Sequence, residues 1–256
     1  MTMILYAWAA VALLMFLLWL LHFPLKNASI VDAGWALGIA ICACFAAALG
    51  QGTEARRLLI ASMVVFWGLR LAAHLVLDRM WGHPEEGRYV ELREKWKTNI
   101  GIKFFGFYQL QALTCVILAT PFFLASRDPT PIRASDFLGL LVWVIGLVGE
   151  SIADHQLKNF KSIAASSGLT CRVGLWNYSR HPNYFFEWLT WVGYAIIALP
   201  SEWGGLGIVS PAIILFLLLR VTGIPATEEH AVRSRKDYRE YQQVTSAFVP
   251  WFRKTS

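Results

Sequence analysis

The stretch MILYAWAAVALLMFLLWLLHF, residues 3–23, decides the fold class, because it contains no Asp, Glu, Lys or Arg. A helix needs about 20 apolar residues to cross a bilayer core of about 30 Å. The stretch is therefore long enough for one membrane-spanning helix. It is too long for the core of a signal peptide and lacks a basic leader, so we expect it to be retained.

Further apolar stretches of similar length follow along the chain. They are continuous rather than alternating, which favours helices. We expect an all-α fold, an integral membrane bundle of seven transmembrane helices, in which residues 1–256 form a single transmembrane domain and residues 223–256 a cytoplasmic tail. The predicted spans cover about 3–23, 29–50, 58–79, 104–125, 136–157, 183–200 and 203–222.

The composition points the same way. The chain is 56% hydrophobic and only 16% charged, against about a quarter charged in a soluble domain. These values exclude a disordered chain and argue against an ordinary soluble domain. The net charge of +6 suits nucleic acid or anionic lipid by itself, but in so apolar a chain its placement matters more, and we expect no nucleic-acid partner. The scattered His and Cys residues show no metal-ligand spacing, so no metal site is expected.

The distribution of Lys and Arg predicts the orientation. With seven spans, one side of the membrane holds 18 of these residues and the other holds Arg56, Arg57, Arg127 and Arg133. Cytoplasmic loops carry the excess of positive charge. We therefore expect the N-terminus outside and the C-terminus in the cytoplasm of a multi-pass integral membrane protein.

Several ionisable residues fall inside the predicted spans, where each costs about 2.5–3.5 kcal/mol at mid-bilayer. Residues four apart share one face of a helix, so three spans each carry a polar stripe, and all the polar groups fall in the cytoplasmic half. One interpretation is structural ion pairs between helices. The other, which we favour, is a hydrated cavity that holds a ligand with phosphates and hydroxyls. The ionisable residues concerned in the spans are Asp32, Arg70, His74, Asp78, Glu150, Asp154 and Glu187; the polar residue Asn183 accompanies them, and Lys158 and Lys161 continue the stripe beyond residue 157.

The densest polar stretch is GLWNYSRHPNYFFE, residues 174–187. Pro182 suits the first turn of a helix, and Ser179 is placed to precede it as a cap. Arg180 and His181 then lie beside a helix N-terminus, which favours anions. An anion site and simple positive-inside flanking remain equally open.

These motifs resemble two groups of membrane enzymes. The run Arg180-His-Pro-Asn-Tyr184, with Glu187 one turn on, and Glu228-Glu229 ahead of later Tyr and Pro residues are similar to the NADPH-dependent sterol and steroid reductases and to the isoprenylcysteine carboxyl methyltransferases. The stretches VDAGW at 31–35 and GRYVELR at 87–93 resemble the bacterial branch of the steroid 5-alpha-reductase-like family, formerly a domain of unknown function. The resemblance covers nearly the whole chain and favours the reductases.

The resemblance implies that NADPH binds from the cytoplasm and that a lipid-like enone enters from the membrane. It assigns Lys158, Lys161 and Arg172 to phosphate, Asp154 to the adenosine ribose and Asn183 to the nicotinamide end. The implied cofactor-binding residues are Arg70, His74, Asp78, Arg79, Glu150, Asp154, Lys158, Lys161, Arg172, Tyr178, Arg180, His181, Asn183, Tyr184, Glu187 and His230.

The implied catalytic residue is Asp32, which lies near the position of a family Glu. A family Tyr that grips the substrate carbonyl is matched by Trp67, which cannot supply a proton. The hypothesis is hydride transfer from the nicotinamide to the β-carbon of a conjugated lipid, with a protonated Asp32 polarising the carbonyl.

Two other functions remain open. One is a methyltransferase that uses S-adenosylmethionine, against which the cluster of Lys158, Lys161 and Arg172 argues. The other is a non-enzymatic transporter or scaffold, but a transporter needs charges across the whole bilayer. We expect a lipid-like substrate and membrane lipids as partners, no obligate protein partner, and location in a bacterial inner membrane.

Overall fold

The computed structural model describes residues 2–163, 168–221 and 223–253, apart from the side chains of Asp78 and Arg79. The fold is all-α, as predicted, with an isolated β-bridge between Ser179 and Ser246. Two compact units divide the chain: residues 1–133 with 198–206, and residues 134–197 with 207–256. The single domain expected from the sequence stays a prediction.

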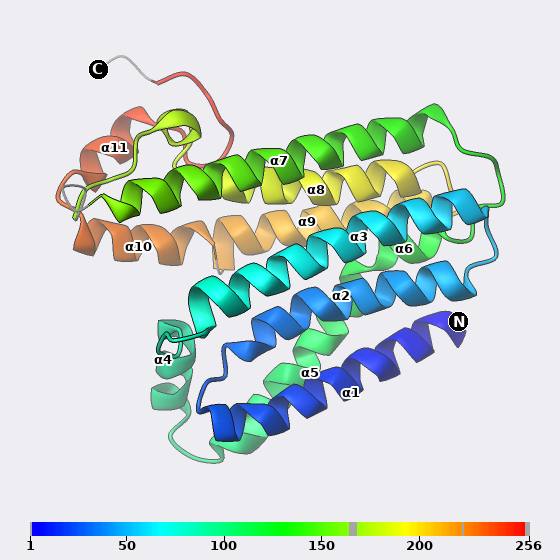
Figure 1. Ribbon diagram of the computed structural model, residues 1–256, viewed down its shortest axis with the longest axis horizontal. Coiled ribbons are helices and arrows are strands. Elements are labelled where there is room, and N and C mark those ends of the chain that lie inside the picture. Colours follow the sequence, from blue (N-terminus) through cyan, green and yellow to red (C-terminus); the bar gives the residue numbers. More distant parts are fainter. Residues whose placement is uncertain (1, 164–167, 222, 254–256) are drawn as a thin grey trace. The chain divides into compact units, whose positions relative to one another are not determined.

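The first unit contains the helices that precede residue 134 (Figure 1). Helix α2 lies at its centre, because it contacts α1, α3 and α5. The α3 helix continues into a short π-helix at Val76–Met80. The helices are α1 (Thr2–Leu25), α2 (Ile30–Leu49), α3 (Glu54–Leu75), α4 (Gly87–Trp96), α5 (Ile100–Leu118) and α6 (Thr120–Ala125).

Small residues explain the central place of α2. A Cβ added at Gly68 of α3 would lie 2.9 Å from the backbone oxygen of Ala36 in α2, so the two backbones nearly touch. Along the most apolar 18 residues of α2, 61% are buried, against 17% along those of α1. Because large apolar side chains cover most of α1, that helix has the surface expected of one facing acyl chains.

The second unit is built on two long helices, α7 (Ala134–Ser162) and α8 (Pro182–Ala198). They pack closely through glycine, since a Cβ added at Gly146 of α7 would lie 2.8 Å from the backbone oxygen of Phe186 in α8. Small residues at helix contacts are typical of membrane proteins. The other elements of this unit are a 3-10 helix at Gly174–Asn177, α9 (Val209–Phe216), a π-helix at Leu217–Val221, α10 (Ile224–Ser234) and α11 (Tyr238–Val244). A 3-10 helix at Gly204–Ile208 contains the point in the chain where the first unit ends and the second resumes.

Within the described residues, six helical segments are long and apolar enough to cross a membrane. They correspond to six of the seven predicted spans, the last being Gly204–Ser234, in which residue 222 is not described. The remaining predicted span, 183–200, corresponds to α8, which has only 17 residues. The number of crossings and the orientation therefore stay predictions.

Two predicted spans are less regular than expected. The span at 104–125 is divided into α5 and α6, which begins at Thr120 with Pro121 in its first turn. Proline has no N–H group and fits only the first turn of a helix, so it starts a new one here. The span at 203–222 changes from 3-10 through α to π geometry.

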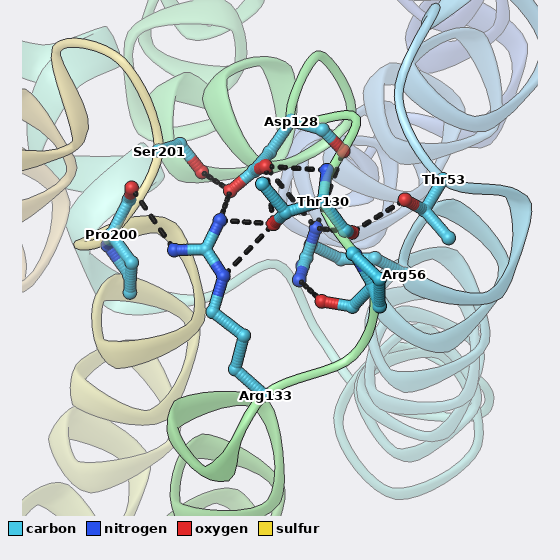
Figure 2. Close-up of polar contacts among 8 residues, drawn as sticks. Thr53, Arg56, Asp128, Thr130, Arg133, Pro200 and Ser201 are labelled. Carbon is cyan, nitrogen blue, oxygen red and sulfur yellow. Dashed lines mark hydrogen bonds and ion pairs between the residues drawn. The ribbon is translucent and has the colours of Figure 1, made fainter.

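An ion-pair cluster around Asp128 joins loops of the first unit (Figure 2). The buried guanidinium of Arg56 donates hydrogen bonds to the backbone oxygens of Asp128 (3.2 Å) and Thr130 (2.9 Å), and it lies 3.5 Å from the Asp128 carboxylate. The Thr53 hydroxyl also donates to the backbone oxygen of Thr130, at 2.5 Å. The loop before α7 is thereby fixed to the start of α3.

The same carboxylate holds a second loop. Arg133 Nη2 lies 2.6 Å from Asp128 Oδ2, and its Nη1 donates to the backbone oxygen of Pro200 at 3.3 Å. The hydroxyl of Ser201 donates to Asp128 Oδ2 at 3.3 Å. A buried carboxylate with several donors is well compensated for the loss of water, and this cluster connects segments that lie more than 70 residues apart.

Candidate cofactor site

The turn before α8 is fixed by the hydroxyl of Ser179. Its Oγ accepts the backbone N–H of His181 at 3.1 Å and donates to the backbone oxygen of Phe248 at 2.8 Å. Helix α8 then begins at Pro182, as the sequence predicts. The turn therefore presents Arg180 and His181 at the helix start, and the C-terminal segment holds it from the other side.

The carboxylate of Glu228, on α10, is the centre of the polar contacts in this unit. Arg180 Nε lies 2.8 Å from Glu228 Oε1, an ion pair without the angle of a hydrogen bond. His181 Nε2 lies 3.2 Å from the same oxygen. From α11, the Tyr238 hydroxyl donates to Oε1 at 3.3 Å and Gln242 Nε2 donates to Oε2 at 2.8 Å.

This arrangement bears on the predicted anion site. Arg180 and His181 both contact the Glu228 carboxylate, so the protein itself offsets part of the positive charge at the helix start. The His181 ring is buried and stacks on the ring of Tyr184, with centroids 5.3 Å apart and planes 9° apart. The Tyr184 hydroxyl lies 3.2 Å from the Thr227 hydroxyl. The motif therefore fastens α8 to α10.

Other predicted residues lie along α7 and α8. Asn183 Nδ2 donates to Asp154 Oδ1 at 3.1 Å, which brings together the two residues expected at the ribose and the nicotinamide. Glu187 Oε1 accepts the indole N–H of Trp191 at 2.9 Å. Glu150 is buried on α7. These carboxylates and amides form a polar stripe on packed helices, as their spacing predicts.

Arg172 lies beside α11. Its Nη1 lies 3.1 Å from Glu240 Oε1, and its Nη2 donates to the backbone oxygen of Asp237 at 3.1 Å. Burial alone would raise the pKa of Asp237, but hydrogen bonds from Thr170 and the charge of Arg172 bring it below its usual value. The buried Nε of Arg172 has no hydrogen-bond partner in the described part of the chain.

Basic residues around Arg172 include two predicted phosphate partners. Lys158 and Lys161 are exposed near the end of α7. Burial raises the pKa of the Cys171 thiol, and the nearby charges of Arg235 and Lys161 oppose that rise, so these cations lie close to the segment that carries Arg172. Tyr178 and His230 are also exposed on this unit.

The predicted catalytic residue, Asp32, lies in the first unit. Its Oδ1 accepts the hydroxyl of Tyr89 at 2.7 Å, and its Oδ2 pairs with Arg88. Burial and the Asp32 carboxylate both raise the pKa of Tyr89, which has no exposed surface. Residues 88 and 89 belong to the GRYVELR stretch, and the structure brings it to the start of α2.

A second ion pair supports this contact. Glu85 accepts two hydrogen bonds from Arg93, at 2.8 and 3.0 Å, and its Oε1 also accepts the backbone N–H of Ala28 at 2.6 Å. A carboxylate is stabilised beside a helix N-terminus. The segment that carries Tyr89 is thus fixed against the entrance of α2.

The remaining predicted residues lie on α3 and its π-helix. Arg70 and His74 are partly buried, and the side chains of Asp78 and Arg79 lie outside the described residues. Trp67 is fully buried and packs edge to face on Trp35, with centroids 6.0 Å apart. That these residues and those of the second unit line one cavity stays a prediction. The described residues contain no group of three His, Cys, Asp or Glu side chains arranged to hold a metal.

Sequence reasoning did not select Glu228, Tyr238 or Gln242 as site residues. A signal for two of them exists, because Tyr238 and Gln242 are four residues apart and share one face of α11. The sequence does not show what that face of α11 contacts, because Glu228 belongs to another helix, α10. The same holds for Tyr89, which is 57 residues from Asp32.

Comparison with known proteins identifies the family. The family model described as "Protein of unknown function (DUF1295)" matches residues 18–245, which is most of the chain. The chain belongs to the DUF1295 family. An uncharacterized protein of Schizosaccharomyces pombe is 27% identical over 91% of this DUF1295 chain and 75% of its own length.

Two named reductases match shorter parts of the DUF1295 chain. The 3-oxo-5-alpha-steroid 4-dehydrogenase 1 of Rattus norvegicus is 25% identical over 44% of the chain and 40% of its own length, in the C-terminal part. The very-long-chain enoyl-CoA reductase of Dictyostelium discoideum is 34% identical over 24% of the chain and 20% of its own length. No solved structure matches significantly. The expected resemblance to the steroid 5-alpha-reductases is confirmed as distant homology.

Proposed function

We propose that this protein is a membrane reductase that uses NADPH to reduce a carbon–carbon double bond in a lipid-like, steroid-like or enone substrate. The observation that carries the proposal is the match of its C-terminal part to a named steroid reductase. That part holds the Glu228 contacts, the Asp154–Asn183 pair and the cations near Arg172. Since the match covers 40% of the relative's length, the activity and the substrate are proposals.

The proposed topology has seven crossings. Helix α8 would be the seventh, and its 17 residues correspond to about 26 Å at 1.5 Å per residue, close to the thickness of a bilayer core. With the N-terminus outside, the excess of Lys and Arg lies in the cytoplasm. We place the protein in a bacterial inner membrane, with its cofactor residues facing the cytoplasmic pool of nucleotide.

The residues of the second unit fit a dinucleotide phosphate. Arg172 has a buried Nε without a partner among the described residues, and Lys158 and Lys161 are exposed ammonium groups in the same part of the unit. Guanidinium and ammonium groups are the usual partners of phosphate. Asp154 and Asn183 offer a carboxylate and an amide to ribose hydroxyls and a carboxamide. NADPH, when bound, supplies the hydride.

Asp32 is the proposed catalytic residue. As a double bond conjugated to a carbonyl is reduced, negative charge develops on the carbonyl oxygen, and a donor aimed at that oxygen lowers the barrier. In the structure Asp32 accepts the Tyr89 hydroxyl and pairs with Arg88, so Asp32 would hold the Tyr89 hydroxyl in place, and that hydroxyl is the donor offered to the carbonyl oxygen. Trp67 does not offer a comparable proton source. Overall, the reduction would add one hydride at the β-carbon, supplied by the cofactor, and one proton at the α-carbon, supplied by water, so that the double bond becomes single.

The cofactor proposal is tested with purified protein in a neutral detergent. A ligand that binds only the folded state at 100 times its Kd stabilises the protein by about 2.7 kcal/mol. We expect NADPH to raise the melting temperature, NADH to do so less because it lacks the 2′-phosphate, and S-adenosylmethionine to have no effect. Stabilisation by S-adenosylmethionine instead of NADPH would establish the methyltransferase alternative, and no effect of any of the three would overturn the cofactor assignment.

A further inference from the structure

A half-enclosed cavity of about 470 Å³ lies in the second unit, on the surface formed by the C-terminal segment. This volume is in the range of small-molecule sites. It is separate from the Asp154–Asn183 pair, which does not line it. The residues that decide its chemistry are Arg180, Gln242, Thr245, Val249, Trp251 and Phe252.

The inner wall of the cavity is polar, and part of its hydrogen-bonding capacity is not used by the described residues. Arg180 donates from Nη1 to the backbone oxygen of Gln242 at 2.8 Å, and its Nε faces Glu228, so neither contact uses Nη2. Thr245 is 5% exposed, and its Oγ has no hydrogen-bond partner in the described part of the chain. A buried hydroxyl without a partner is costly, and a bound ligand or water relieves that cost.

The outer rim of the cavity is aromatic and open. Trp251 is 68% exposed and Phe252 76% exposed, with their ring centroids 6.2 Å apart. The backbone beneath them is fixed, because the Trp251 N–H donates to the backbone oxygen of Tyr178 at 2.9 Å. Tyr178 is exposed as well, and its ring packs edge to face on Phe252. A fixed, exposed aromatic cluster of this kind marks a binding surface.

A second positive charge lies on the same side. Burial raises the pKa of Tyr241, and the guanidinium groups of Arg180 and Arg253 oppose that rise, so both cations lie near this ring. Arg253 Nε also donates to the backbone oxygen of Asn177 at 3.4 Å. The aromatic rim is therefore bordered by cations, which favours an anionic ligand with an apolar part.

The position of the cavity relative to α7 indicates that it lies at the level of the membrane surface. The segment before Tyr178 is attached to α7 at Ala153 and Gln156, through the Trp176 indole N–H (2.9 Å) and the Leu175 N–H (2.9 Å). At Asp154 the sequence of α7 changes from an apolar run to DHQLKNFKS. A transmembrane helix changes in this way where it leaves the hydrocarbon core, and Trp and Tyr gather at the same level.

We propose that this cavity binds the headgroup of an anionic phospholipid, with the phosphate beside Arg180 and Thr245 and the start of the acyl chains on Trp251 and Phe252. Arginine forms strong charge-assisted hydrogen bonds to phosphate, and basic residues at the cytoplasmic surface attract anionic lipids. The proposal goes beyond the reduction of a lipid substrate and does not depend on it, because the bound lipid here is a structural ligand.

The test uses the full chain in a neutral sugar detergent, with dihexanoyl phosphatidylglycerol as the probe. Binding is followed by the shift in melting temperature, and dihexanoyl phosphatidylcholine and inorganic phosphate are measured in parallel. The variants are Trp251→Ala, which removes the rim, and Thr245→Val, which keeps the shape and removes the hydroxyl. The matched control is Trp203→Ala, because Trp203 is 73% exposed and does not line the cavity.

We expect phosphatidylglycerol to stabilise the natural protein and the control equally, and each cavity variant to bind it at least tenfold more weakly. If Trp251→Ala and Thr245→Val both bind phosphatidylglycerol as tightly as the natural protein does, the site is overturned. Equal stabilisation by inorganic phosphate would show a simple anion site instead, and equal stabilisation by phosphatidylcholine would overturn the requirement for a net negative lipid. If Thr245→Val does not fold, Trp251→Ala decides alone, since its side chain is exposed.

Discussion

At the residue scale, single carboxylates organise the polar contacts of each unit. Glu228 receives four side chains, Asp128 fixes two loops, and Asp32 receives Tyr89 and Arg88. Each carboxylate is mostly removed from solvent and has several donors, which is the condition for keeping a charge inside a protein. Removing one such group leaves its partners uncompensated.

Replacing Asp32 or Tyr89 tests the proposed chemistry. We expect Asp32→Asn and Tyr89→Phe to leave the melting-temperature shift with NADPH unchanged and to lower turnover about 100-fold, the loss typical of one donor at a developing negative charge. Turnover is measured as NADPH oxidation with a lipid extract that supports activity.

The control for this prediction is Tyr108→Phe. Tyr108 is also fully buried, but its hydroxyl donates to the backbone oxygen of Ala28, at 3.0 Å. We expect its loss to lower stability and to leave turnover within about threefold of the natural protein. Unchanged turnover in both Asp32→Asn and Tyr89→Phe would remove these residues from the mechanism.

Glu228→Gln tests the centre of the second unit. The amide keeps the shape but removes the charge that Arg180 and His181 share, and we expect a loss of about 2 kcal/mol, or a fall in melting temperature of about 4–8 °C. The adjacent Glu229 is a matched control, since it is 64% exposed and pairs only at the surface with Arg233. Glu229→Gln should change the melting temperature by less than 2 °C, and an equal effect of both changes would contradict a central role for Glu228.

At the element scale, glycine decides how the long helices of the second unit meet. Gly139 and Gly146 lie two turns apart on α7, and a Cβ added at either would lie 2.7 Å or 2.8 Å from a backbone oxygen of α8, that of Gly193 or Phe186 respectively. The glycines let the helix axes approach, and dispersion contacts along the seam replace the missing hydrophobic drive between helices in lipid. Any side chain at these positions pushes against backbone, which cannot move away by changing rotamer.

Gly146→Ala is expected to separate α7 from α8 and to lower the melting temperature by several degrees, a loss of about 1–3 kcal/mol from overpacking. The control is Gly106→Ala in α5, where an added Cβ meets nothing within 4 Å. That change should be neutral or stabilise by about 0.5–1 kcal/mol, because alanine is the better helix former. The prediction fails if Gly146→Ala melts at or above the temperature of Gly106→Ala.

At the scale of the whole molecule, loops far apart in sequence are held by charge as well as by apolar packing. In the first unit, burial alone would raise the pKa of Asp128, but hydrogen bonds from Thr130 and the charges of Arg56 and Arg133 bring it below its usual value near 3.8. The folded state therefore holds this proton less tightly than the unfolded chain does. Its contribution to stability is present above pH 3.8 and is lost as the pH falls through the lower, folded value.

Melting temperatures between pH 6 and pH 3 test this contribution. We expect the natural protein to lose stability below about pH 4, and Asp128→Asn to be less stable at pH 6 by about 2 kcal/mol. The difference between the two proteins should shrink as the pH falls, because the natural carboxyl becomes neutral as well. A difference that stays constant down to pH 3 would show that the charge of Asp128 does not stabilise the cluster.

The sequence by itself determined the all-α class, the place of the apolar helices and the start of α8 at Pro182. These are local properties: a run of about 20 apolar residues is sufficient for a membrane-spanning helix, and proline suits a first turn wherever it occurs. The polar stripe of Asp154, Asn183 and Glu187 was also foreseeable from helical spacing.

Only the tertiary structure decided which charges meet. Glu228 lies 47 residues from His181, and Tyr89 lies 57 residues from Asp32, so no spacing rule connects them. The strength of such a pair depends on the distance, the burial and the other donors around it, and the chain acquires these only when separate helices pack together.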